Sequence, residues 1–144
     1  MGVTVRVPAK VDVQLAVGGA RPDGFHDLAN VFLAVALYDE ITVTEADELR
    51  VTCSGPDAAQ VPLDLTNLAA RAAPALAARP GLEAAAHIHI AKDIPVAGGM
   101  AGGSADGAGA LSAFHDVRRR EAANDTGDLA LREALPAVGR KDVP

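Results

Sequence analysis

Tryptophan is absent from this sequence, cysteine occurs once, and aromatic residues make up only 3% of its 144 residues. A core must therefore be built from alanine, valine, leucine and isoleucine, within a hydrophobic content of 49%. Cys53 has no second cysteine with which to form an internal disulfide, and no basic and apolar leader precedes the first expected strand. We therefore expect a reducing, cytoplasmic setting.

Basic residues are fewer than acidic ones, 13 Lys and Arg against 19 Asp and Glu, which gives a formal net charge of −6. Proteins that bind nucleic-acid backbones need a basic face, so we expect no nucleic-acid partner. No apolar run approaches the roughly 18 residues that a membrane-spanning helix needs, so we expect no membrane span. The length is that of one domain with a core of its own.

Alternating apolar and polar residues predict strands mainly in the first half of the chain, and alanine-rich segments predict helices in the second. The expected strands are 3–7, 11–17, a buried strand at 29–37, 40–44, 49–53 and 86–91, with a turn between Gly18 and Gly24. The expected helices are 67–78, capped by Thr66 and kinked or split at Pro74, then 105 to about 118, and 129–138. This order predicts an α+β fold, a two-layer sandwich.

The last expected strand carries His87 and His89, whose side chains share one face because they lie two residues apart. A zinc site would need at least one further ligand, and the sequence suggests none. We therefore expect a solvent-facing pair and no metal bound by the protein.

The most informative segment reads Pro-Val-Ala-Gly-Gly-Met-Ala-Gly-Gly-Ser-Ala-Asp and lies between an expected strand and an expected helix. Its glycines, Gly98, Gly99, Gly102 and Gly103, can adopt positive φ angles that turn successive N–H groups toward an anion. A helix beginning near Ser104 would add unpaired amides and the positive end of its dipole. These features favour a phosphate site, and the alternative is a plain connector.

Two common nucleotide-binding patterns do not fit this segment. A Walker A loop requires a lysine where this chain has Ser104, although Gly98 and Gly103 have the right separation. The dinucleotide fingerprint would place its loop after the first strand of the unit, with an acidic residue about 20 residues further on.

Four motifs in order resemble the GHMP kinase superfamily, and within it the 4-diphosphocytidyl-2-C-methyl-D-erythritol kinases. They are Pro8-Ala9-Lys10, Asp23-Gly24-Phe25-His26, the glycine-rich segment and Asp142-Val143-Pro144. The resemblance implies a GHMP kinase N-terminal domain over residues 1–144. It also implies ATP-dependent phosphorylation of a hydroxyl on the methylerythritol unit of a CDP-linked small molecule. It covers only the N-terminal half of such an enzyme, so we expect an incomplete chain without the C-terminal domain.

The resemblance also implies roles for individual residues. Lys10 and Asp142 match the catalytic lysine and aspartate, and Phe25 and His26 match the pair that handles the cytosine base. Asp12 falls in the substrate site, where the family has an asparagine. Mg²⁺ is expected to arrive with ATP. The ATP-binding loop falls on Pro95, Val96, Ala97, Gly98, Gly99, Met100, Ala101, Gly102, Gly103, Ser104 and Ala105.

The sequence departs from the family pattern in ways that keep two alternatives open. Asp12 replaces an amide with a carboxylate close to Lys10, and Gly107 and Gly109 stand where alanines are expected. One alternative is another GHMP kinase, acting on homoserine or a mevalonate. The other is a truncated, non-catalytic product that binds a nucleotide and self-associates through apolar surface that a second domain would cover.

Overall fold

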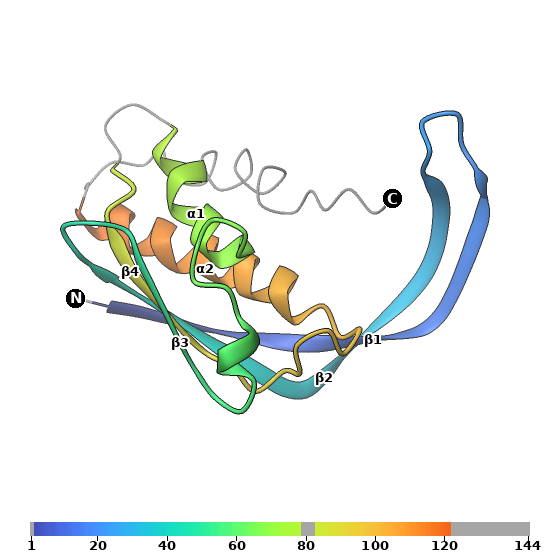
Figure 1. Cartoon of the computed structure of the whole chain (residues 1–144), viewed down its shortest axis with the longest axis horizontal. Coiled ribbons are helices and arrows are strands. Elements are labelled where there is room, and N and C mark those ends of the chain that lie inside the picture. Colours follow the sequence, from blue (N-terminus) through green and yellow to red (C-terminus); the bar gives the residue numbers. More distant parts are fainter. Residues whose placement is uncertain (1, 79–82, 122–144) are drawn as a thin grey trace.

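The computed structural model describes residues 2–78 and 83–121. These residues form a four-stranded sheet with two helices packed against one face (Figure 1), so the predicted α+β two-layer architecture is confirmed. In chain order the elements are β1 (Gly2–Ala20), β2 (His26–Glu45), β3 (Arg50–Ser54), a short 3₁₀ turn η1 (Ala58–Gln60), α1 (Leu68–Ala77), β4 (Ala86–Ala91) and α2 (Gly102–Glu121).

The sheet is mixed, with the strand order β1-β2-β4-β3. Strands β1 and β2 are antiparallel, as are β2 and β4, whereas β3 and β4 run parallel. Helix α2 packs on β1 and β2, and α1 packs against α2. The core between these layers includes Ile41, Ile88, Leu111 and Phe114, all fully buried.

The first two strands are longer than the sequence predicts, because each merges two expected strands into one. Register shifts at Pro8/Ala9 and Asp12/Gln14 let β1 continue through the expected break. Pro8 is tolerated because β1 is an edge strand and the proline sits at one of these irregularities. Gly18 and Gly19 belong to β1, and the turn is confined to residues 21–25, with Gly24 at φ +83°.

The strand predicted at 29–37 is present as part of β2, but the prediction that it is buried is wrong, because residues 29–34 are exposed and Val35 and Leu37 are only half-buried. The far half of the β1–β2 hairpin extends well beyond the helices (Figure 1). Phe32 and Leu33 are each 56% exposed, and Val13 and Leu15 on the facing strand are also exposed. Apolar composition predicted burial, but among the described residues the helices cover only the near half of the hairpin.

The two helices differ from prediction mainly at their ends. Asn67 caps α1, because its side chain accepts the Ala69 N–H at 2.9 Å, while Thr66 hydrogen-bonds to Asp64 instead. Helix α1 runs through Pro74 without being split. Helix α2 begins at Gly102, earlier than expected, and the helix predicted at 129–138 lies outside the described residues.

Helix α2 packs tightly on the sheet at Gly109. A Cβ atom there would lie 2.7 Å from Val7 Cγ1 and 3.0 Å from Ile41 Cγ1. The glycine that departs from the family pattern therefore suits the packing of this chain.

Candidate functional site

A cavity of about 350 Å³ opens beside the glycine-rich loop that joins β4 to α2. This size is within the usual range for small-molecule sites. One wall comes from the loop and the first turn of α2, and the other comes from the segment before α1. The lining residues are Gln60, Val61, Pro62, Thr66, Asn67, Leu68, Lys92, residues 95–104 and Asp106.

The backbone of this loop has three residues in the left-handed region, Ala97 at φ 58°, Gly99 at φ 71° and Ala101 at φ 57°. Of the four glycines that were expected to allow positive φ angles, only Gly99 adopts one. Non-glycine residues reach this region at a cost of about 1 kcal/mol or more each. Alternation of left-handed and other conformations forms concave nests of N–H groups, which suit an anion.

The remaining glycines have different relations to their surroundings. A Cβ on Gly102 would lie 2.7 Å from Lys92 Nζ and 3.0 Å from Ile94 Cγ2, so this glycine lets α2 approach Lys92. A Cβ on Gly98 would lie 3.2 Å from Pro95 Cβ, whereas Gly103 faces open space. The Ala105 N–H donates to the Ala101 carbonyl at 3.0 Å. The amides of Gly102, Gly103 and Ser104 precede that bond and are directed out of the helix end.

Beneath the loop lies a buried cluster that the sequence analysis missed. Lys92 Nζ donates to Asp39 Oδ2 and, at 2.8 Å, to Asp106 Oδ2. The other oxygen of Asp39 accepts the N–H groups of Asp93 at 2.7 Å and Ile94 at 2.8 Å. Oδ1 of Asp106 is buried and has no hydrogen-bond partner among the described residues.

Burial and mutual contact shift the pKa values of all three groups. Burial raises the pKa of Asp106 to about 7, against the lowering effect of Lys92. Burial also opposes ionisation of Asp39, but hydrogen bonds from Lys92 and from the Ile94 amide bring its pKa below the ordinary value. Burial would lower the pKa of Lys92, yet its hydrogen bonds to Asp106 and Asp39 raise it. Lys92 and Asp39 are thus a charged pair at neutral pH.

A second glycine brings the chain close to Lys92. Gly55 follows β3 at φ +115°, and a Cβ there would lie 2.0 Å from the Lys92 carbonyl oxygen. The Lys92 N–H donates to the Ser54 carbonyl at 2.8 Å. The end of β3 therefore fixes the backbone of Lys92, while Gly102 makes room for its ammonium group.

Lys10 lies beside the loop but does not line the cavity. Its backbone N–H donates to the Met100 carbonyl at 3.1 Å, which ties β1 to the glycine-rich loop. Its ammonium group donates to Asp12 Oδ2 at 2.6 Å and lies 5.1 Å from the centre of the Phe32 ring. Asp12, which stands where an asparagine was expected, thus gives Lys10 a carboxylate partner.

Phe25 and His26 sit at the tip of the hairpin and are not part of the cavity wall. Phe25 is 42% exposed, and its N–H donates to Asp23 Oδ1 at 3.2 Å. His26 Nδ1 is hydrogen-bonded to the Gly18 carbonyl at 2.8 Å. Asp142, the expected catalytic aspartate, lies outside the described residues.

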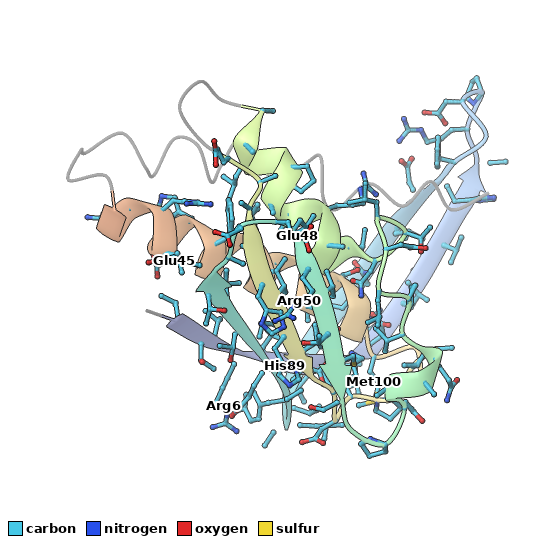
Figure 2. All side chains as sticks on the ribbon, turned by 60° about the vertical axis from the view of Figure 1, so that its left-hand side comes forward. Arg6, Glu45, Glu48, Arg50, His89 and Met100 are labelled. Carbon is cyan, nitrogen blue, oxygen red and sulfur yellow. The ribbon has the colours of Figure 1, made fainter. Side chains whose placement is uncertain are left out.

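His87 and His89 lie together on the sheet face opposite the buried Ile88 and Ile90, where Arg50 Nη2 is 3.4 Å from His87 Nδ1. Figure 2 labels His89 and Arg50 on the neighbouring strands β4 and β3. Thr52 Oγ1 is 2.7 Å from His87 Nε2 and 2.8 Å from His89 Nδ1, and Ser54 Oγ is 3.1 Å from His89 Nε2. Within residues 2–78 and 83–121, no three His, Cys, Asp or Glu side chains are grouped so as to hold a metal ion.

The same part of the chain contains no helix long and apolar enough to cross a membrane.

The sequence is similar to those of known kinases. Residues 67–138 match the family described as GHMP kinases N terminal domain. The chain is 84% identical over 113 residues to 4-diphosphocytidyl-2-C-methyl-D-erythritol kinase from Streptomyces avermitilis, which covers 78% of this chain and 38% of that protein. It is 52% identical over 145 residues to the enzyme of the same name from Kineococcus radiotolerans, covering 99% of this chain and 43% of the relative.

The fold is also similar to that of a solved kinase structure. The crystal structure of a 4-(cytidine 5'-diphospho)-2C-methyl-D-erythritol kinase superposes with a TM-score of 0.70 at 28% identity. The match covers 96% of this chain and 46% of that one. The chain therefore spans less than half the length of these relatives.

Proposed function

Because the chain belongs to the family of GHMP kinase N-terminal domains, we propose that it forms the ATP-binding part of a 4-diphosphocytidyl-2-C-methyl-D-erythritol kinase. The observation that carries the proposal is the cavity at the glycine-rich loop, where nests of N–H groups and the start of α2 face one space. Such an arrangement attracts a phosphate.

In this proposal the ATP phosphates lie against residues 97–104. The loop amides and the amides of the first turn of α2 donate to phosphate oxygens, and the Ser104 hydroxyl donates a further hydrogen bond from the cavity wall. Mg²⁺ that accompanies ATP supplies charge neutralisation during phosphoryl transfer. The described residues offer it no cluster of protein ligands, so the phosphates themselves would hold it.

We assign the chemical step to Lys10 and Asp142. Phosphoryl transfer depends mainly on positioning and charge stabilisation, so a cation near the transferred group and a carboxylate that orients the acceptor hydroxyl are sufficient parts. The contact with Met100 brings the backbone of Lys10 to the loop. Its ammonium group would have to exchange Asp12 for a phosphate oxygen during the reaction.

The substrate end of the proposal rests on the hairpin tip. The exposed ring of Phe25 can stack on a pyrimidine. Because Nδ1 of His26 is engaged by Gly18, a hydrogen bond to the base would come from Nε2. Asp12, beside Lys10, would lie closer to the acceptor sugar than to the base.

Nucleotide binding is the first test, measured by titration calorimetry of the chain with Mg-ATP. Ser104→Ala removes a hydrogen bond to a charged group, which is worth about 1.5–3 kcal/mol, so we expect affinity to fall roughly 10- to 100-fold. Ser112→Ala, on the same helix but outside the cavity, is the matched control and should bind normally. Unchanged affinity in Ser104→Ala would contradict the assigned phosphate site.

Phosphoryl transfer is the second measurement, followed as ADP release in the presence of the CDP-linked methylerythritol substrate. Lys10→Ala and Asp142→Asn should each reduce turnover while leaving Mg-ATP binding nearly intact. Competition by CDP separates a cytidine-reading kinase from one that acts on homoserine or a mevalonate. Nucleotide binding without any turnover would favour a product that only binds nucleotides.

A further inference from the structure

The buried cluster of Lys92, Asp39 and Asp106 lies directly under the glycine-rich loop, and the proposed reaction does not use it. Lys92 and Asp106 both line the cavity, although Lys92 is only 4% exposed and Asp106 only 2% exposed. The cluster connects the end of β4 to the first turns of α2 and to β2. It therefore supports the backbone that would hold a phosphate.

The cluster contains one cation and two carboxyl groups. Asp39 accepts hydrogen bonds from Lys92 and from the amides of Asp93 and Ile94. Asp106 has one oxygen on Lys92 and one buried oxygen with no partner among the described residues. If Asp106 is ionised, the cluster carries a net charge of −1. If Asp106 holds a proton, the cluster is neutral and Asp106 can donate to Asp39.

Among residues 2–78 and 83–121, few other charges lie on the elements packed around Asp106. From β3, Cys53 contributes a thiol that stays neutral at physiological pH, because burial and then the charge of Asp106 raise its pKa. From the segment after β3, Asp57 faces the loop, where its carboxylate accepts the Val96 N–H at 3.1 Å. On β1, Lys10 is paired with Asp12. The balance of charge under the loop is thus decided mainly by Asp106.

Burial places the pKa of Asp106 at about 7. A phosphate in the cavity adds negative charge nearby, and a neighbouring like charge favours the neutral form of a carboxyl group. Protonation and phosphate binding then favour each other, because coupling between two ligands on one protein is reciprocal.

We propose that Asp106 is a proton-linked positioning residue, which becomes more fully protonated when a nucleotide phosphate enters the glycine-rich loop, so that nucleotide binding weakens as the pH rises. This inference rests on the proposed nucleotide site. It adds a regulatory property to that site, namely dependence on the proton concentration near neutrality, and assigns it to a residue that is distinct from the donors to the phosphate.

The test compares three proteins by titration calorimetry with Mg-ATP from pH 6 to pH 9. If the phosphate raises the pKa of Asp106 by about one unit, wild-type affinity falls about tenfold over this range. In Asp106→Asn the amide side chain cannot ionise, so the part of the pH dependence that comes from Asp106 should be lost. Asp93→Asn removes the same charge from an exposed neighbour of Lys92 and should follow the wild type. The titration of ATP itself is common to all three and cancels.

A direct measurement covers the case in which Asp106→Asn does not fold. Carboxyl ¹³C shifts of the wild-type chain report the Asp106 titration with and without Mg-ATP, and the midpoint should move to higher pH when nucleotide is bound. An unmoved midpoint, or equal pH dependence in wild type and Asp106→Asn, would overturn the inference while leaving the nucleotide site intact. Absence of Mg-ATP binding at every pH would overturn both proposals.

Discussion

Replacing Lys92 with methionine would leave two buried carboxyl groups without the cation that they share. Lys92 is 4% exposed and donates to Asp39 and Asp106, and methionine fills a similar volume without a charge. Removing one partner of a buried ion pair typically costs about 3–5 kcal/mol. Asp39 keeps two amide donors in the variant, so we expect a loss of about 4 kcal/mol in the free energy of unfolding at pH 8.

The loss should depend on pH, with a sign that follows from Asp106. Its folded pKa of about 7 lies above the ordinary value of 3.8, so the folded state binds an extra proton between these values and stability declines as the pH rises through them. Without Lys92 the folded pKa rises further, and the decline continues to higher pH. At pH 5 Asp106 is already neutral, so the variant loses the hydrogen bonds from Lys92 to Asp39 and Asp106 but leaves only Asp39 as a buried charge, and the cost falls to about 2 kcal/mol.

The assay is urea unfolding followed by far-ultraviolet circular dichroism at pH 5 and pH 8. Lys10→Met is the matched control, because Lys10 also contacts a carboxylate but at a partly exposed site, where such pairs contribute about 0–1 kcal/mol. A loss below about 1 kcal/mol for Lys92→Met at pH 8, or a larger loss at pH 5 than at pH 8, would refute this account of the cluster.

Two further changes test how the elements around the cavity are held. Asn67→Ala removes the cap of α1 and the bond from Nδ2 to the Pro62 carbonyl, so urea unfolding should show a loss of about 1–2 kcal/mol, whereas Thr66→Ala should change little. Equal effects of the two would contradict the assigned cap. Gly55→Ala forces a Cβ against the Lys92 carbonyl at φ +115° and should lower stability by about 3 kcal/mol; Gly103→Ala meets open space, and a similar loss there would point to another cause.

Local patterns predicted much of the fold because the signals involved act over short distances. The strand at 86–91 is confirmed to the residue, and the strand near 49–53 and both described helices are confirmed within a few residues. The strand junctions at Pro8 and near Tyr38 were wrong. A proline or a break in alternation marks an irregularity, and only the partner strand shows that pairing resumes beyond it.

The buried cluster was missed although its positions carry a usable signal. Lys92 continues the inward-facing series of Ile88 and Ile90, and Asp39 precedes Ile41 on the core side of β2. Opposite charges at inward positions of neighbouring strands predict a buried pair. The alanines at positive φ in the loop had no comparable signal, because residues other than glycine rarely adopt this conformation and alanine itself does not indicate it.

The tie between Lys10 and Met100 has a mechanical consequence for the hairpin. From Lys10 to the end of β1 at Ala20 the strand extends about 33 Å, at about 3.3 Å per residue. The hairpin therefore extends far from Lys10, where β1 is hydrogen-bonded to the glycine-rich loop. A rotation of about 10° at Lys10 would carry Phe25 and His26 through about 6 Å, given this strand length. Small differences in loop geometry are therefore magnified at the hairpin tip.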